Sequence, residues 1–334
     1  MGRFSLADRR LGAEVAAVSV QRDEGNAVPP KPDTGLSDGL FRPVAALHLP
    51  GQAFAGGGIR WVLDVLGACF ACSMDEVQIT HYLDRLGVTR LAEPDARSLR
   101  ALQFAHLRTV PFENLSIHLG EPISLDSDAL FDKIVNRRRG GFCYELNGLF
   151  AELLTALGYR VTLLAARVFG GGAPGPLFDH LALRVDLDES WLVDVGFGDF
   201  SDEPLRLHER AEQKDGGGVF RIAPAPGDHG DHGDLDITHN GDPGYRLTAR
   251  PYELADFVPM CWWQATSPQS HFTRSPICSM RTAQGRTTLR DRKLIHSVDG
   301  ERIERVLDET ELLPAYLDSF GIALDRVPSA TPPS

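Results

Sequence analysis

The sequence N-R-R-R-G-G-F-C-Y-E-L-N-G-L-F-A-E-L-L-T-A-L, from Asn136 to Leu157, decides the fold of this chain. Its apolar residues recur at spacings of three and four, which predicts an amphipathic helix, and they are Leu146, Leu149, Phe150, Leu153, Leu154 and Leu157. Gly140 and Gly141 break the chain before this pattern, and Gly158 stands where a helix would end. We therefore expect Cys143 at or just inside the helix N-terminus.

Cys143 is a candidate nucleophile because of this predicted position. The positive end of a helix dipole favours a thiolate over a thiol, and the three arginines at 137–139 are expected to add to the effect. The alternative is that Cys143 is a small buried residue that fills space at the base of the helix, as free cysteines often do. The helix alone does not decide between the two.

A cysteine nucleophile needs a base and a group that orients the base, and two later segments offer them. His180 precedes the alternating sequence L-A-L-R-V and is expected at the start of a strand. Asp194 lies in W-L-V-D-V-G-F-G, which reads as a second strand after a short turn. Strands so close in sequence usually pair as a hairpin. Asp194 lies between two valines, so its carboxylate is expected to be buried and to need a partner such as His180.

These segments resemble the signature blocks of the arylamine N-acetyltransferase family. The matching sequences are R-G-G-F-C-Y-E-L-N, D-H-L-A-L-R-V and W-L-V-D-V-G-F-G, together with H-L-R-T-V-P-F-E-N-L upstream, from His106 to Leu115. Their order and spacing agree with the family, and the resemblance extends from about Met74 to Val327. It implies a catalytic triad of Cys143, His180 and Asp194.

The resemblance also implies an activity. A chain of this family would transfer an acetyl group from acetyl-CoA to an arylamine, an arylhydrazine or a similar amine, through an acetyl-cysteine intermediate. Phe142 and Phe197 are expected to contact the substrate. No permanently bound cofactor and no metal are implied. The nearer alternative is an amide synthase of the same superfamily, which closes a polyketide macrolactam, and the remoter one is a hydrolase with a similar triad.

The fold implied by the resemblance is α+β, with a core related to the cysteine proteases. It consists of an N-terminal helical bundle that carries the nucleophile, a central β-barrel that carries the histidine and the aspartate, and a C-terminal α/β lid. The expected boundaries are a poorly ordered extension at 1–73, the bundle at 74–160, the barrel at 161–260, a linker and the lid at 261–327, and a loose tail at 328–334. The extension is rich in Gly, Pro and Ala, and we expect the family-like part to begin near Met74.

Local patterns predict further elements. Helices are expected from Asp75, from Ser98 to Thr109 with Ser98 as the N-cap, and from Asp126 or Ser127 to Val135. Ile277 and 280–289 are expected to form a strand pair with Gly285 in the turn, and 302–320 a last helix that Gly321 ends. Two alternatives are left open for Glu113 and Arg139. They form an ion pair that anchors the loop before Cys143, or both side chains are solvated.

Composition restricts the class of partner. The net charge of −12 argues against a general nucleic-acid surface, and an anionic donor such as CoA would have to be attracted by a local basic patch. Five cysteines, an odd number, do not indicate a disulfide framework, so the reducing cytoplasm is expected. The apolar run 61–73 is too short to span a membrane. The Asp/His/Gly segment 228–234 could bind a metal, but a solvated loop is the favoured interpretation, and the sequence does not indicate an oligomeric state.

Overall fold

The computed structural model describes residues 74–90, 93–226, 233–298 and 301–329. The predicted extension 1–73 and the proposed start near Met74 therefore lie outside, or at the edge of, the described residues. Most of the Asp/His/Gly segment also lies outside, because 227–232 is not described.

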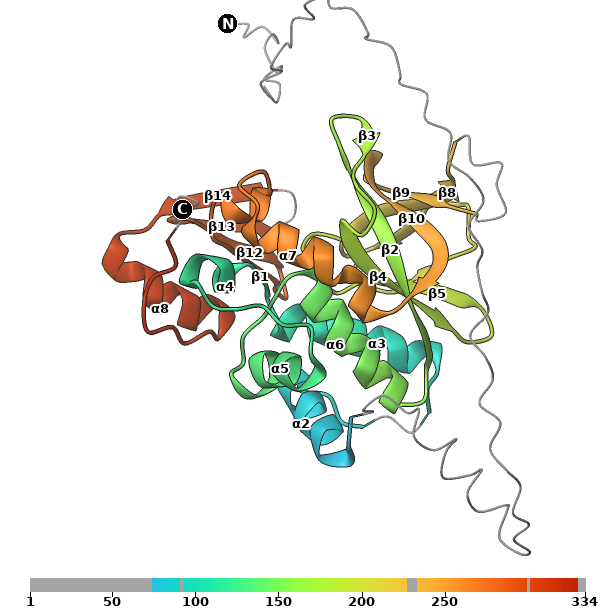
Figure 1. Ribbon diagram of the computed structural model, residues 1–334, viewed down its shortest axis with the longest axis horizontal. Helices are drawn as coiled ribbons and strands as arrows, with labels where there is room; N and C mark the ends of the chain where they lie inside the picture. Colours follow the sequence, from blue (N-terminus) through green and yellow to red (C-terminus); the bar gives the residue numbers. More distant parts are fainter. Residues whose placement is uncertain (1–73, 91–92, 227–232, 299–300, 330–334) are drawn as a thin grey trace, which may run out of the picture. The chain divides into compact units, whose positions relative to one another are not determined.

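The N-terminal part is helical, as predicted (Figure 1). Its elements are α2 (Glu76–Leu86), α3 (Ala96–Thr109), α4 (Leu115–Leu119), α5 (Ser127–Phe131), the π-helix η2 (Asp132–Asn136) and α6 (Cys143–Ala156). The prediction of Ser98 as an N-cap is wrong. Helix α3 begins two residues earlier, and Asp95 is its N-cap, because the Asp95 carboxylate accepts a hydrogen bond from the Ser98 backbone N–H.

Helix α6 is the central helix of the fold. Its predicted apolar stripe is buried except at Leu157, the partly buried C-cap, and Tyr144, Glu145 and Asn147 on other faces are buried as well. The reason is that α6 packs against α2 and α5 on one side and against strands β2 (Arg160–Gly170) and β4 (His180–Asp186) on the other. Because it is covered on several sides, polar residues on α6 must find partners inside the protein.

An antiparallel sheet curls into a nearly closed barrel beside α6 (Figure 1). Eight strands follow the order β6-β5-β4-β2-β10-β9-β8-β7, and β3 pairs with β2. The additional strands are β3 (Ala173–Pro174), β5 (Ser190–Val193), β6 (Leu205–Arg206), β7 (Gln213–Asp215), β8 (Gly218–Pro224), β9 (Leu235–His239) and β10 (Asp242–Tyr252). The side chain of Gln213 bridges the two end strands, since it accepts from the Arg206 N–H at 2.7 Å and donates to the Arg206 carbonyl at 3.0 Å.

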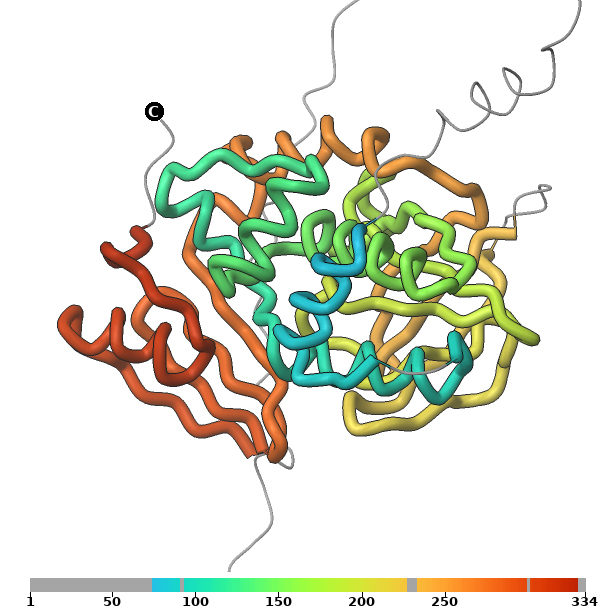
Figure 2. Tube along the Cα trace, turned by 90° about the horizontal axis from the view of Figure 1, so that it is seen from below, coloured from blue at the N-terminus to red at the C-terminus, as the bar shows by residue number. Residues whose placement is uncertain are grey.

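A second antiparallel sheet forms the C-terminal part, and one helix covers one of its faces (Figure 2). Its order is β1-β11-β12-β13-β14, with β1 (Phe112–Glu113), β11 (Ile277–Arg281), β12 (Gly285–Arg290), β13 (Lys293–Val298) and β14 (Glu301–Val306). Helix α8 (Glu309–Phe320) packs its apolar side chains on the sheet. The predicted strand pair is confirmed as β11 and β12, but Gly285 is the first residue of β12 and does not lie in the turn. The helix predicted over 302–320 is wrong at its start, because 301–306 pairs with β13 as an edge strand.

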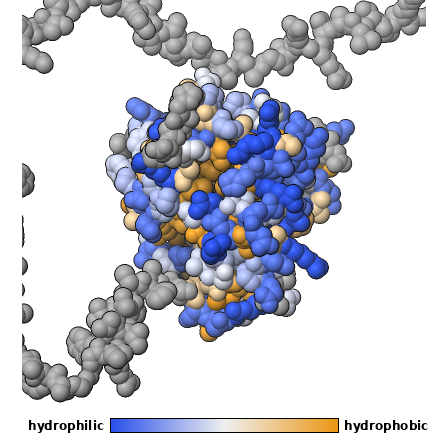
Figure 3. All heavy atoms as spheres, turned by 90° about the vertical axis from the view of Figure 1, so that its right-hand side faces the viewer, coloured by the Kyte–Doolittle hydropathy of each residue, from blue (hydrophilic) through white to orange (hydrophobic). Residues whose placement is uncertain are grey.

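The two sheets are connected by the segment from η3 (Leu254–Phe257) through α7 (Val258–Thr266) to η4 (His271–Thr273). Apolar side chains of the barrel fill its interior, and the face seen in Figure 3 is mostly hydrophilic around a smaller apolar area. No helix among the described residues is long and apolar enough to cross a membrane.

Candidate active site

Cys143 is the first residue of α6, as the sequence predicted. The side chain is 3% exposed and lines a large cavity between the barrel and the C-terminal sheet. The first N–H groups of a helix have no acceptor within the helix, so they present positive partial charge at this end. The sulfur therefore lies where a negative charge is favoured.

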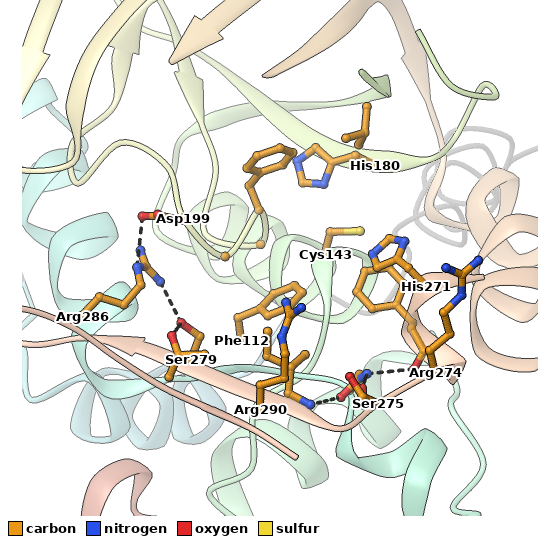
Figure 4. A pocket seen from close by; sticks show the side chains of 18 of the residues that line it. Phe112, Cys143, His180, Asp199, His271, Arg274, Ser275, Ser279, Arg286 and Arg290 are labelled. Carbon is orange, nitrogen blue, oxygen red and sulfur yellow. Dashed lines mark hydrogen bonds and ion pairs between the residues drawn. The ribbon is translucent and has the colours of Figure 1, made fainter. Parts of the chain in front are cut away.

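The predicted hairpin brings His180 and Asp194 together. Strands β4 and β5 pair antiparallel, with Asp186 opposite Ser190, so the first residue of β4 and the residue after β5 lie at the same end. His180 Nε2 lies 2.7 Å from Asp194 Oδ2, and both side chains are buried. The Cys143 side chain lies close enough to His180 to raise the pKa of the imidazole, and Figure 4 shows both side chains at the same cavity.

Asp194 accepts hydrogen bonds on both of its oxygens. Oδ1 accepts from Asn147 Nδ2 and from the Gly196 backbone N–H, each at 2.9 Å. Oδ2 accepts from His180 and from the hydroxyl of Tyr245 at 3.2 Å. A carboxylate held by four donors keeps one orientation, so the imidazole it contacts is held as well.

Asn147 and Tyr245 were missed by the sequence reasoning. Asn147 is four residues after Cys143, hence on the same face of α6, and this spacing was a usable signal. Its amide also donates to the Leu181 carbonyl at 2.6 Å and accepts from the Val195 N–H at 2.9 Å. Tyr245 lies on β10, and nothing local in the sequence marks it.

Gly196 lets the loop after β5 approach the helix. A Cβ at this position would lie 2.6 Å from the Cα of Cys143 and 2.8 Å from Asn147 Nδ2. Both distances are shorter than heavy atoms tolerate, so a side chain here would push the Asp194 loop away from Cys143.

The charge state of His180 follows from its neighbours. Burial alone would lower the pKa of the imidazole, but the Asp194 carboxylate and the Cys143 side chain raise it to about 10. The protonated imidazole is therefore favoured at neutral pH. This is the state that a thiolate–imidazolium pair requires.

A pH dependence of stability follows, and it is clearest in Cys143→Ala, where no thiol at this position titrates. A group whose pKa is raised on folding stabilises fully below its unfolded value and loses this effect as pH rises through its folded value. We expect the free energy of unfolding of Cys143→Ala to fall as pH rises above 6.5, over a range that ends below the wild-type value of about 10, because the contribution of Cys143 to the raised pKa is absent. Urea unfolding at a series of pH values measures it.

The double variant Cys143→Ala/His180→Gln is the control for this measurement, because every other titrating group is shared. Its unfolding free energy is expected to lack the part of the decline that His180 causes. Parallel curves for the two proteins would contradict a raised pKa at His180.

The cavity has a volume of about 1450 Å³, above the roughly 300–1,000 Å³ usual for small-molecule pockets. Cys143, His180 and Phe197 lie on its wall, and Phe197 packs edge-on against the imidazole with ring centroids 5.1 Å apart. Phe142 does not line it. This ring is fully buried against Tyr144 and Phe272, so its predicted substrate contact has no support from its position.

Within the described residues, no group of three or more His, Cys, Asp and Glu side chains is arranged to hold a metal ion. The sequence did not indicate which residues would bind a cofactor.

Comparisons with known proteins identify the family. The model of an N-acetyltransferase family matches residues 95–328. An arylamine N-acetyltransferase from Mycolicibacterium smegmatis is 36% identical over 254 residues, which cover 73% of this chain and 91% of that protein. Human arylamine N-acetyltransferase 1 is 30% identical over 279 residues, which cover 75% of this chain and 96% of the human protein. The chain belongs to the arylamine N-acetyltransferase family.

Solved structures of this acyltransferase family share the fold. An arylamine N-acetyltransferase from Salmonella typhimurium has a TM-score of 0.69 at 31% identity and covers 78% of this chain and 96% of its own. The Mycobacterium marinum arylamine N-acetyltransferase, solved in complex with CoA, has a TM-score of 0.66 at 34% identity. The match covers 73% of this chain and 92% of the M. marinum chain. The predicted α+β fold of helices, barrel and C-terminal sheet is thus confirmed.

The arginines before Cys143 do not act as the sequence predicted for this N-acetyltransferase. None of the residues at 137–139 lines the cavity. Arg137 pairs with Asp132 on the surface at 2.9 Å, and Arg139 is buried against Glu113. The expectation that they stabilise a thiolate directly is wrong, because none of the three lines the cavity and the guanidinium groups of Arg137 and Arg139 bind carboxylates outside it.

The pair between Glu113 and Arg139 is confirmed and belongs to a buried network beneath the N-acetyltransferase site. Arg139 Nη2 lies 2.9 Å from Glu113 Oε1, and Arg139 Nη1 lies 3.1 Å from Glu121 Oε2. Lys133 lies 2.7 Å from Glu145 on α6, whose Oε2 accepts from the Phe142 N–H at 3.2 Å. Burial would raise the pKa of Glu113, but Lys133 and Arg139 hold it below its usual value. The network fixes the loop that leads into Cys143.

Replacing Arg139 by methionine is expected to lower the free energy of unfolding by about 3–5 kcal/mol. The reason is that Glu113, which has no exposed side-chain surface, would lose its closest cationic partner. Arg137→Met is the matched control, since its pair with Asp132 is about half exposed and such pairs contribute less than about 1 kcal/mol. Denaturant unfolding compares the two. Equal losses would contradict a structural role for the buried pair.

Proposed function

We propose that this protein acetylates arylamines, arylhydrazines or similar amines by a ping-pong reaction in which Cys143 carries the acetyl group. The observation that carries the proposal is the alignment of three groups. Cys143 and His180 lie on the wall of one cavity, the Cys143 side chain raises the pKa of His180, and His180 forms a hydrogen bond with Asp194.

In the first half-reaction the Cys143 thiolate attacks the carbonyl carbon of an acetyl thioester. The tetrahedral intermediate collapses, the C–S bond to the donor breaks, and the leaving thiolate takes the proton from the His180 imidazolium. Backbone N–H groups at the start of α6 are candidates to stabilise the oxyanion. Asp194 holds the imidazole in one orientation and stabilises its charged form.

In the second half-reaction the amine nitrogen attacks the acetyl-cysteine. His180, now neutral, accepts a proton from the amine, and the Cys143 sulfur leaves as the thiolate. Phe197 is the proposed contact for the aromatic ring of the acceptor, because it lies on the cavity wall beside His180.

Acetyl-CoA is the proposed acetyl donor, and no permanently bound cofactor is required. The size of the cavity supports a donor as large as CoA, and the M. marinum relative is described in complex with CoA. The cytoplasm is the proposed location, because its reducing conditions suit a thiol nucleophile, and the three cysteines of the described residues are free.

The experiment that tests the proposal is an intact-mass measurement after the protein is mixed with acetyl-CoA alone. One added acetyl group, located on Cys143 by peptide mapping and lost when an arylamine is added, is the expected result. A protein that stays unmodified until the amine is present would rule out the ping-pong order. Rapid loss of the acetyl group to water, without amine, would favour a hydrolase.

A further inference from the structure

The wall of the cavity is positively charged, although the whole chain carries a net charge of −12. Its acidic residues are Asp179, Asp199 and Asp291, and its basic residues are Arg274, Arg286, Arg290, Arg292, Lys293 and Arg302. Most of these cations come from the face of the C-terminal sheet that α8 does not cover. A local field of this kind attracts anions in spite of the opposite net charge.

The cations concentrate at the turn between β12 and β13. This hairpin reads R-D-R-K from Arg290 to Lys293, and Arg290 lies directly opposite Lys293 in the register. Like charges in directly opposite positions destabilise an antiparallel pair. The repulsion between Arg290 and Lys293 therefore destabilises this hairpin.

Several of these charges are neutralised within the protein. Arg286 lies 3.0 Å from Asp199, and Arg292 lies 3.6 Å from Asp308. Glu304 lies 3.1 Å from Lys293 and 2.6 Å from Arg302. Because these side chains already form ion pairs within the protein, they offer less positive charge to a ligand in the cavity.

Two cations on the wall have no such partner. Neither Arg274 nor Arg290 forms an ion pair with any described residue, and both side chains are exposed. Figure 4 shows them with His271 on the side of the cavity near Cys143. The two guanidinium groups are close enough to act on His271 together, since burial, Arg274 and Arg290 all lower the pKa of that imidazole. Two unpaired arginines beside a largely neutral histidine are a favourable site for a phosphate.

We propose that Arg274 and Arg290 bind the phosphate groups of CoA. The inference rests on the proposed function, which places the thioester of the donor at Cys143. CoA carries its reactive sulfur at one end and its phosphates at the other, and this cavity has the thiol and the unpaired arginines on one continuous wall. Arginine suits the role because its planar group donates two parallel hydrogen bonds to a phosphate.

The test compares two acetyl donors in the full-length protein with Arg274→Gln/Arg290→Gln. Acetyl-CoA carries the phosphates, and p-nitrophenyl acetate does not. A charged hydrogen bond is worth about 1.5–3 kcal/mol, so we expect KM for acetyl-CoA to rise at least about tenfold. We expect kcat, and the rate of acetylation by p-nitrophenyl acetate, to stay unchanged. KM of the wild type is expected to rise more steeply with salt than KM of the variant.

Arg305→Gln is the matched control. It makes the same substitution once, on strand β14 of the same sheet, but Arg305 does not line the cavity and pairs with Glu311 at 3.1 Å on the surface. Its kinetic constants for both donors are expected to equal those of the wild type.

The outcomes separate this inference from the proposed function. A wild type that acetyl-CoA does not acetylate contradicts the proposed function itself. A wild type that is acetylated, with a double variant of equal KM, overturns the phosphate site alone. Equal losses with both donors would mean that the arginines maintain structure. A raised KM for 4-aminobenzoate but not for aniline, with acetyl-CoA unaffected, would assign the arginines to an acceptor carboxylate instead.

Discussion

Replacing Cys143 with alanine is expected to abolish acetyl transfer, with a loss on the order of a million-fold when the nucleophile of a triad is removed. The sulfur is the atom that would carry the acetyl group, and no other described cysteine can replace it. Cys261 and Cys278 are both buried, their pKa values are raised by burial, and neither lines the cavity. Steady-state assays of arylamine acetylation, together with intact mass after acetyl-CoA, measure the loss.

The fold should survive this change. Alanine removes one sulfur from a helix N-terminus and leaves the contacts of Asn147 and Asp194 in place. The circular dichroism spectrum is expected to match that of the wild type. Cys261→Ala is the control, since it removes a neighbouring buried thiol and should keep full activity. Normal turnover by Cys143→Ala, or loss of activity in Cys261→Ala alone, would contradict the assignment of the nucleophile.

The arrangement of Cys143, His180 and Asp194 was predictable because local patterns set most of it. Helical spacing placed Cys143 at a helix start, and alternation with a short turn placed His180 and Asp194 at one end of a hairpin. What remained was whether helix and hairpin meet. Sequence periodicity cannot answer that, because their packing depends on the barrel as a whole.

The predictions that were wrong depended on long-range contacts. The arginines at 137–139 are close to Cys143 in sequence, but buried Glu113 and exposed Asp132 determine where two of their side chains point. Residues 301–306 adopt a strand because β13 offers a free edge, although their composition also suits a helix. Tyr245 reaches Asp194 across 51 positions of sequence, which no local motif can reveal.

Replacing Asp194 with asparagine is expected to lower kcat/KM by about 10³–10⁴-fold while the protein remains folded. The change is nearly isosteric, but an amide offers one acceptor oxygen where the carboxylate has two. Asn147 and Gly196 donate to one oxygen, and His180 and Tyr245 donate to the other. One of these pairs of donors would then face an NH₂ group, so the imidazole would lose either its partner or its orientation.

The pKa of His180 gives a second measurement for the same variant. The negative charge of Asp194 is the main cause that raises this pKa to about 10, so its removal should allow burial to lower it. We expect the ring to be neutral at pH 7 in Asp194→Asn, as NMR of a labelled histidine would show. A thiolate at Cys143 would then lack its cationic partner, which links the change of charge to the loss of rate.

Asp186→Asn is the matched control for Asp194→Asn. Asp186 lies at the other end of β4, accepts from the Ser190 hydroxyl at 2.6 Å and does not line the cavity. Its replacement should leave both kcat/KM and the His180 pKa unchanged. If Asp194→Asn kept its rate although His180 became neutral, the imidazolium would be unnecessary for the reaction. If it lost its rate although His180 stayed protonated, Asp194 would act through orientation alone.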